Sequence, residues 1–104
     1  MALTLSTQQD EGAMWHVGDA EREETCLAFG CLPAQFQGGV IFFRKTERTH
    51  ALFAAWREEW ERWGGQDQAA LLRALRRVPA KVWLLGRPYN GGSLMAHLFG
   101  KARA

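Results

Sequence analysis

Asp67 and Gln68 are the two neighbouring residues whose types best suit chemistry on a polar ligand. A carboxylate accepts hydrogen bonds from hydroxyl groups, and a carboxamide both donates and accepts them. The pair follows two glycines and precedes a run of alanine and leucine, so we expect it to open a helix. An aspartate at that position can instead cap the free backbone N–H groups of its own helix. The pattern favours neither role.

The other half of the expected site is an apolar strand preceded by Gly38 and Gly39. Residues 40–43 are four consecutive β-branched or aromatic residues, which predicts a strand buried on both faces by covering helices. The two glycines permit an unusual backbone turn or the close approach of another group. Because α/β proteins place ligands beside strand ends, we expect this strand and the helix that opens with Asp67 to form one site.

His97 is a third candidate, because it lies in an apolar segment that ends in Gly100 and Lys101. A single histidine among apolar residues is more often a hydrogen-bonded structural residue than a metal ligand. The glycine permits close backbone approach, however, and Lys101 and Arg103 would suit phosphate oxygens. The sequence leaves both interpretations open.

An amphipathic helix is expected to follow the strand, from a cap near Thr46 to about Trp63. Gly64 and Gly65 would end it, because glycine adopts the left-handed conformation without strain. Its apolar stripe recurs at three- and four-residue steps and consists of Leu52, Phe53, Trp56, Trp60 and Trp63. Three tryptophans on one stripe could form a ligand platform, but large aromatic residues usually belong to the core, and we predict a core role here.

A second helix is predicted from residue 66 or 67 to about Val78, where Pro79 breaks it. Its buried stripe is expected to consist of Leu71, Leu72, Leu75 and Val78. Three arginines are expected to lie off this stripe: Arg73, Arg76 and Arg77. Residues 81–85 predict a second strand and residues 86–92 a loop. The order strand, helix, helix, strand predicts an α/β domain.

The 104 residues suit one domain, and 47% hydrophobic residues permit a modest core. Residues 35–104 carry these patterns, whereas residues 1–34 form a poorly defined segment in which residues 21–24 suggest a short helix. No run approaches the ~20 apolar residues of a membrane helix, and residues 1–10 lack the features of a signal peptide. A cytoplasmic protein is therefore expected, with Cys26 and Cys31 as free thiols.

The net charge of +2 conceals an asymmetry along the chain. Residues 1–67 carry eleven acidic and six basic side chains, whereas residues 68–104 carry seven basic side chains and no acid. Such a segment either attracts anions or forms a solvated, arginine-rich helix face, and the sequence favours neither. Nucleic-acid binding is not expected, because the aromatic residues gather in the first helix instead of alternating with the basic ones.

Residues 36–103, about two-thirds of the chain, resemble the C-terminal half of nucleotide-diphospho-sugar transferases of the GT-A fold. The glycogenin-like and bacterial lipopolysaccharide galactosyltransferase-like groups are the nearest types. Residues 36–41, Phe-Gln-Gly-Gly-Val-Ile, are similar to the family's Phe-Asn-small-Gly-Val strand. Residues 67–71 resemble its Asp-Gln helix start, and residues 88–101 resemble its Tyr/Trp-Asn loop and closing His-x-x-Gly-Lys segment.

The resemblance implies a partial GT-A-like, Rossmann-like sheet and transfer of a hexose from a nucleotide-diphosphate sugar. It implies that Asp67 and Gln68 contact the donor sugar near the reacting carbon. A divalent metal, Mn²⁺ or Mg²⁺, would be held on the donor diphosphate with His97 as one ligand. The remaining donor-binding residues implied by the resemblance are Gln37, Gly38, Asn90 and Lys101.

The chain departs from the family pattern in ways that limit the expected activity. The family binds metal and nucleotide through an Asp-x-Asp motif, but the aspartates here are Asp10, Asp19 and Asp67. Gln37 also replaces the usual asparagine. We therefore expect a truncated glycosyltransferase-like domain that is inactive alone or depends on its missing N-terminal half. The alternative is a protein–protein interaction module that docks or self-associates through an exposed sheet edge and its tryptophan stripe.

Overall fold

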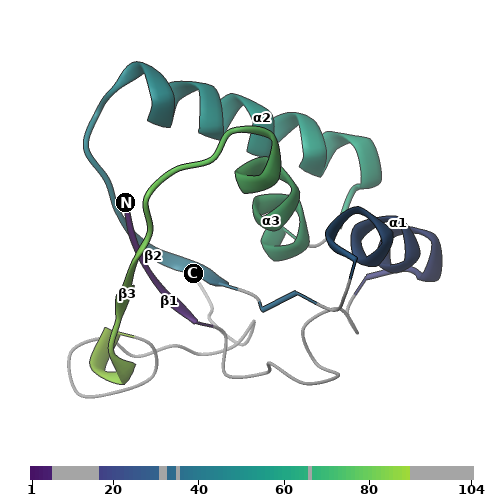
Figure 1. Ribbon diagram of the computed structural model, residues 1–104, viewed down its shortest axis with the longest axis horizontal. Coiled ribbons are helices and arrows are strands. Elements are labelled where there is room, and N and C mark those ends of the chain that lie inside the picture. Colours follow the sequence, from purple (N-terminus) through teal and green to yellow (C-terminus); the bar gives the residue numbers. More distant parts are fainter. Residues whose placement is uncertain (6–16, 31–32, 35, 66, 90–104) are drawn as a thin grey trace, which may run out of the picture.

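The computed structural model describes residues 1–5, 17–30, 33–34, 36–65 and 67–89, which form a small sheet and three helices (Figure 1). The elements are β1 (Ala2–Leu5), α1 (Asp19–Phe29), β2 (Phe36–Phe42), α2 (Glu47–Trp63), α3 (Asp67–Arg77), β3 (Trp83–Leu85) and the short 3₁₀ helix η2 (Arg87–Tyr89). The segment from β2 to β3 has the predicted order of strand, helix, helix and strand, so the α/β class is confirmed.

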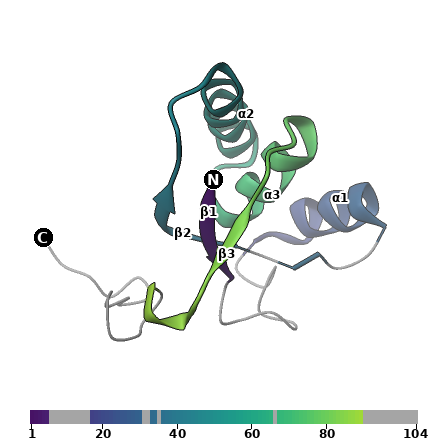
Figure 2. The ribbon, with the colours of Figure 1, turned by 60° about the vertical axis from the view of Figure 1, so that its left-hand side comes forward.

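The sheet is mixed, and its described strands lie in the order β2, β1, β3. β1 runs antiparallel to β2 and parallel to β3. The sequence patterns predict no strand within residues 1–34, yet β1 is the central strand and joins the two predicted ones (Figure 2). A four-residue strand is too short to show periodicity, so only its pairing with two distant segments reveals it.

β1 is buried on both faces, because Leu3 is fully buried and Thr4 is nearly so. Met1 packs against the buried residues of the helices. Side chains alternate along a strand, so Met1 and Leu3 face the helices and Thr4 faces the other side of the sheet. The backbone N–H of Trp83 donates to the Met1 carbonyl across 2.8 Å, which extends the pairing of β1 with β3.

A bulge interrupts the pairing of β2 with β1 at the two glycines of β2. Thr4 pairs with Gln37 but Ala2 pairs with Phe42, so β2 carries extra residues opposite this stretch of β1. Phe42 is 49% exposed. The prediction of a strand buried on both faces is therefore wrong, because β2 lies at an edge of the described sheet and α2 and α3 lie on one side of it (Figure 2).

Helix α2 begins and ends where the sequence predicts. The Thr46 hydroxyl accepts from the Thr49 N–H across 3.2 Å, and the Thr49 hydroxyl accepts from the Thr46 N–H across 2.9 Å. This reciprocal capping box satisfies two backbone donors at the helix start. At the other end Gly64 and Gly65 have φ angles of 63° and 127°, which favour glycine. The turn reverses the chain, so that α3 packs against α2 (Figure 1).

The core lies where α2 and α3 meet each other and the sheet. Its buried apolar residues are Leu3, Leu52, Ala55, Ala69, Ala70, Leu71, Leu72 and Ala74. The stripe predicted for α3 is confirmed for Leu71 and Leu72, which are buried. Leu75 and Val78 are partly buried against the Leu52 cluster.

The buried face of α2 is rotated relative to the predicted stripe. Its buried residues are Thr49, Leu52, Ala55 and Glu59. Trp60 is 45% exposed, and Trp56 and Trp63 are half-buried. The core prediction is therefore wrong for Trp60. Ala55 meets Ala74 of α3 in one buried cluster, and these small side chains let the helices approach closely while the large rings lie at the flank.

Helix α1, suggested by the charged residues 21–24, is joined to α2 and α3 by a buried ion-pair network. Arg73 of α3 donates to Glu21 of α1 across 2.8 Å and to Glu59 of α2 across 3.4 Å. It also donates to the Thr25 hydroxyl across 3.0 Å. The prediction that Arg73 lies off the buried face is wrong, because two glutamates compensate its charge and permit burial.

Candidate functional site

Asp67 and Gln68 open helix α3, as predicted, and lie beside the first residues of β2. The Gln68 side-chain amide donates to the Phe36 carbonyl across 3.0 Å. The Trp56 indole N–H donates to the Asp67 carbonyl across 2.7 Å. These two hydrogen bonds hold the start of α3 between β2 and α2, so three elements position the Asp67 carboxylate.

Gly38 lies directly beside this carboxylate. A Cβ atom at Gly38 would lie 3.5 Å from the Trp56 ring and 4.0 Å from Asp67 Oδ2. Positive φ angles in the described chain occur at other glycines, so the backbone conformation does not require a glycine here. The absent side chain instead leaves space beside Trp56 and Asp67. The structure thus brings the glycine-led strand and the Asp67 helix start together, as the sequence predicts.

An open cavity of about 490 Å³ lies against these residues. It is lined by Phe53, Trp56, Arg57, Trp60, Gly65 and Asp67. The Trp60 indole N–H donates to the Gly65 carbonyl across 3.2 Å, so backbone hydrogen bonds orient both indoles. Apolar ring faces and one carboxylate therefore border the same space, a composition typical of small-molecule sites.

The two charged residues of this cavity differ in their freedom to bind a ligand. Arg57 donates to Glu61 across 3.0 Å on the surface of α2, so its charge is already paired. The Asp67 carboxylate has no ion-pair or hydrogen-bond partner within the described part of the chain. It is exposed, and it remains available to accept hydrogen bonds from a ligand.

Gln37 lies apart from this cavity. It pairs with Thr4, which faces away from the helices, so its side chain lies on the opposite side of the sheet from Gly38. Its Oε1 accepts from the Gly39 N–H across 3.1 Å, a local contact within the bulge. Of the donor-binding residues implied by the family resemblance, Gly38 joins Asp67 and Gln68, whereas Gln37 does not.

The other implied site residues, Asn90, His97 and Lys101, lie outside the described residues. Within the ranges that are described, no three histidine, cysteine, aspartate or glutamate side chains gather to hold a metal ion. Asp67 is the single carboxylate among the described residues that line the cavity, whereas a hard divalent cation takes about six ligands. These residues therefore supply at most one protein ligand, and the metal ligand that the resemblance implies, His97, lies outside the described residues.

Two arginines of α3 do not supply a free anion site, because each is paired with glutamate. Arg73 is paired with Glu21 and Glu59, and Arg77 donates to Glu58 across 2.7 Å. The hydrogen bond to Glu58 raises the pKa of the Arg77 guanidinium above its ordinary value. The basic segment is expected either to attract anions or to form a solvated, arginine-rich helix face. These two arginines therefore do not support an anion site on α3.

The sequence patterns also missed the Trp60 ring as part of a site, since they assign it to the core. The spacing that places three tryptophans on one stripe was the available signal, because it also allows a ligand platform. The Cys26 thiol is free, as predicted, and it is half-buried. Cys31 is not among the described residues.

Comparisons with protein-family models, with curated proteins and with solved structures found no match to this chain. None of the described helices is both long enough and apolar enough to cross a membrane.

Proposed function

We propose that this chain is a truncated glycosyltransferase-like domain whose Asp67 cavity binds the sugar of a nucleotide-diphosphate hexose. The observation that carries the proposal is the Asp67 carboxylate, which has no partner among the described residues and shares one open cavity with the Trp56 and Trp60 rings, beside Gly38. The resemblance of residues 36–103 to the C-terminal half of such transferases supports the same ligand class.

Each of these residues has a role that its chemistry suits. Asp67 accepts hydrogen bonds from sugar hydroxyls, which orients the ring. Trp60 presents an exposed ring face against which the apolar C–H face of a sugar packs. Gln68 donates an amide N–H to the Phe36 carbonyl, so it positions the start of α3 and leaves its own Oε1 as an acceptor.

The cavity supplies little for the leaving diphosphate. Arg57 is the one cation among its described lining residues, and it is paired with Glu61. Transfer of a hexose from a nucleotide sugar requires stabilisation of the negative charge that develops on the leaving group. We therefore infer that these residues bind and orient the sugar, and that the full reaction needs groups from outside the described chain.

Calorimetric titration of the full chain with UDP-glucose and UDP-galactose, each with Mg²⁺, tests the proposal. The Asp67→Asn variant should bind about tenfold more weakly, because it loses a charge-assisted hydrogen bond. Asp19→Asn is the matched control, since Asp19 is likewise the exposed first residue of a helix. Equal affinity of the wild type and Asp67→Asn would remove the proposal, as would the absence of binding to either donor.

The same titration tests the metal ligand that the resemblance implies. His97→Ala should abolish any dependence of nucleotide-sugar affinity on Mg²⁺ or Mn²⁺ while the free hexose still binds at Asp67. A metal-dependent affinity that survives in this variant would exclude His97 as a metal ligand.

A second candidate function is protein–protein interaction, favoured by the apolar side chains at the edges of the sheet. Trp83 is 75% exposed, Leu84 is 58% exposed and Phe42 is 49% exposed. Edge strands with exposed apolar side chains pair readily with another chain. Light scattering should then report a dimer or larger species that Trp83→Ser converts to monomer, and a monomer at high wild-type concentration would exclude self-association.

A further inference from the structure

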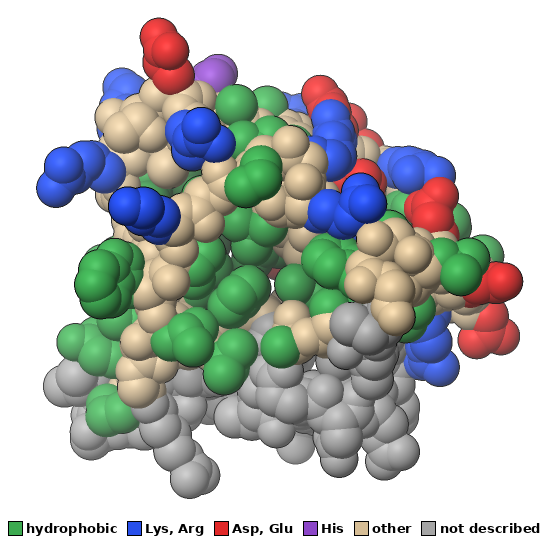
Figure 3. Space-filling model, viewed as in Figure 1, with side chains coloured by type: hydrophobic (Ala, Val, Ile, Leu, Met, Phe, Trp, Pro, Cys, Tyr) green, Lys and Arg blue, Asp and Glu red, His purple; other side chains and the backbone are tan. Residues whose placement is uncertain are grey.

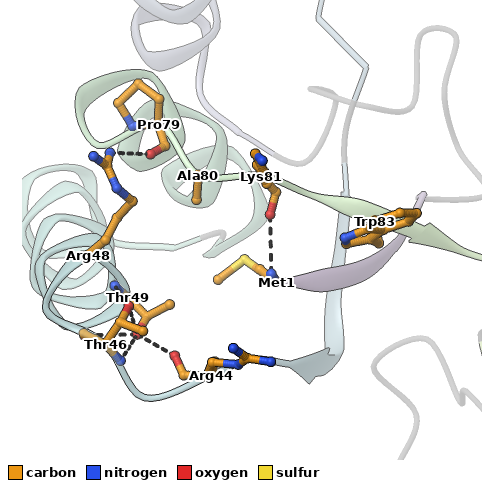
Figure 4. Close-up of a pocket in the computed structure, with 9 residues that line it drawn as sticks. All are labelled: Met1, Arg44, Thr46, Arg48, Thr49, Pro79, Ala80, Lys81 and Trp83. Atoms are coloured by element: carbon orange, nitrogen blue, oxygen red, sulfur yellow. Dashed lines mark hydrogen bonds between the residues drawn. The ribbon is translucent and has the colours of Figure 1, made fainter.

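A second cavity, of about 880 Å³, lies at the far end of β2 from Asp67 (Figure 4). Three basic residues from separate segments line it: Arg44 just after β2, Arg48 in the first turn of α2 and Lys81 just before β3. Met1, Thr49 and Trp83 complete much of the wall. Arg44 follows Gly38 by six residues, a span of at most about 20 Å of extended chain, and the two cavities share no described lining residue, so this cavity is a separate site.

The charge of this cavity is not compensated by any described residue. Its described lining residues include no acid. Four other arginines of the described chain are each paired with glutamate: Arg57, Arg62, Arg73 and Arg77. Arg44, Arg48 and Lys81 have no acidic partner within the described ranges. Figure 3 agrees, since basic side chains gather near the start of α2, whereas acidic and basic ones alternate over the other end of the molecule.

The backbone holds one of these cations in place. Arg48 donates from one terminal nitrogen to the Pro79 carbonyl across 2.7 Å, as Figure 4 shows. A carbonyl is neutral, so the guanidinium keeps its charge and its other N–H donors. The neighbouring acid, Glu47, is exposed and lines a different cavity together with Lys45.

The start of α2 adds to the positive potential of this cavity. Thr46 and Thr49, which cap α2, both line it. Helix N-termini carry partial positive charge, and basic residues that line one concave surface raise the local concentration of anions. A volume of this size also falls within the range of small-molecule sites.

We propose that the Arg44–Arg48–Lys81 cavity binds the diphosphate group of a small molecule. Three cations exceed what a single carboxylate or sulfate needs, whereas a diphosphate offers several charged oxygens spread over two phosphorus centres. Arginine pairs with such oxygens in a bidentate manner, and lysine contributes a point charge. This site is independent of the sugar-binding role proposed for Asp67.

Isothermal titration of the full chain with inorganic pyrophosphate tests this site. The double variant Arg44→Gln, Lys81→Gln should bind pyrophosphate about a hundredfold more weakly, at about tenfold for each charge-assisted hydrogen bond that is removed. The control variant Lys45→Gln, Arg76→Gln removes the same net charge from exposed positions outside the cavity and should retain the affinity. Asp67→Asn should also bind pyrophosphate unchanged.

Further ligands distinguish the source of the diphosphate. Pyrophosphate should bind at least as tightly as orthophosphate or sulfate. ADP that binds more tightly than pyrophosphate would identify a nucleotide as the source, and equal affinity would identify the diphosphate group alone. Either result supports the site.

Other results would overturn it. These are the absence of saturable pyrophosphate binding and an equal loss of affinity in the control variant. Binding that depends on Lys101 but not on Arg44 and Lys81 would also do so. Tighter binding of a single-stranded oligonucleotide than of pyrophosphate would replace the proposal with a nucleic-acid surface.

Discussion

The Arg73 guanidinium donates to the Glu21 carboxylate across 2.8 Å, and this buried contact joins α3 to α1 across 52 positions of the chain. Both side chains are 6% exposed, so the ion pair is shielded from solvent. Glu59 of α2 shares the same guanidinium at 3.4 Å. One arginine therefore links all three helices.

Removing this arginine should be strongly destabilising. Arg73→Ala leaves two buried glutamates without a partner, and the free energy of unfolding should fall by about 3–5 kcal/mol. Arg57→Ala is the control, because Arg57 forms an exposed pair with Glu61 that is worth about 0.5 kcal/mol or less. Urea denaturation followed by circular dichroism measures both. Similar losses in the two variants would contradict the structural role of the network.

Leu52 of α2 is fully buried in the core, whereas Leu27 of α1 is 74% exposed. Leu52→Ala should lower the free energy of unfolding by about 2–5 kcal/mol, since it removes apolar contacts and leaves a cavity. Leu27→Ala should change it by about 0.5 kcal/mol or less. If chemical denaturation ranked the two variants in the reverse order, the assignment of the core would be incorrect.

The capping box at the start of α2 should be measurable by itself. Thr46→Ala removes the acceptor of the Thr49 N–H and should lower the free energy of unfolding by about 1 kcal/mol. Thr46→Ser retains a hydroxyl and should lose much less. Thermal unfolding of both variants checks the prediction. An unchanged midpoint for Thr46→Ala would mean that water satisfies the helix start equally well.

Gln68 should matter to stability as well as to the site. Its amide donates to the Phe36 carbonyl in a partly buried position, so Gln68→Ala should lower the free energy of unfolding by about 1 kcal/mol. Gln68→Glu should be at least as unfavourable, because a carboxylate cannot donate to a carbonyl. Chemical denaturation at neutral pH compares them. If both variants are as stable as the wild type, this contact does not hold α3 against β2.

Variants at Gly38 test folding and ligand binding separately. A Cβ at this position would make ordinary contact with the Trp56 ring at 3.5 Å, so Gly38→Ala should stay folded with a stability change of about 1 kcal/mol or less. The larger Gly38→Val fills the space beside Asp67 and should weaken nucleotide-sugar binding. Denaturation and calorimetric titration give the two readouts. Full affinity in a folded Gly38→Val variant would exclude this space as the sugar site.

Local patterns in the sequence determine the limits of the helices. Thr46 and the glycine pair after Trp63 set the ends of α2 through hydrogen bonds and backbone angles that involve residues only a few positions apart. The start of α3 at Asp67 is predictable for the same reason, because two glycines precede it and a run of alanine and leucine follows it. Such interactions depend on neighbouring residues, so the sequence expresses them directly.

Only the tertiary structure decided which side chains are buried and which meet at a site. β1 is central because two distant segments pair with it, and Arg73 is buried because Glu21 and Glu59 reach it from other helices. The same holds for the cavity that brings Arg44, Arg48 and Lys81 together from three segments. Charge compensation and strand pairing depend on residues far apart in the chain, and no local pattern encodes those distances.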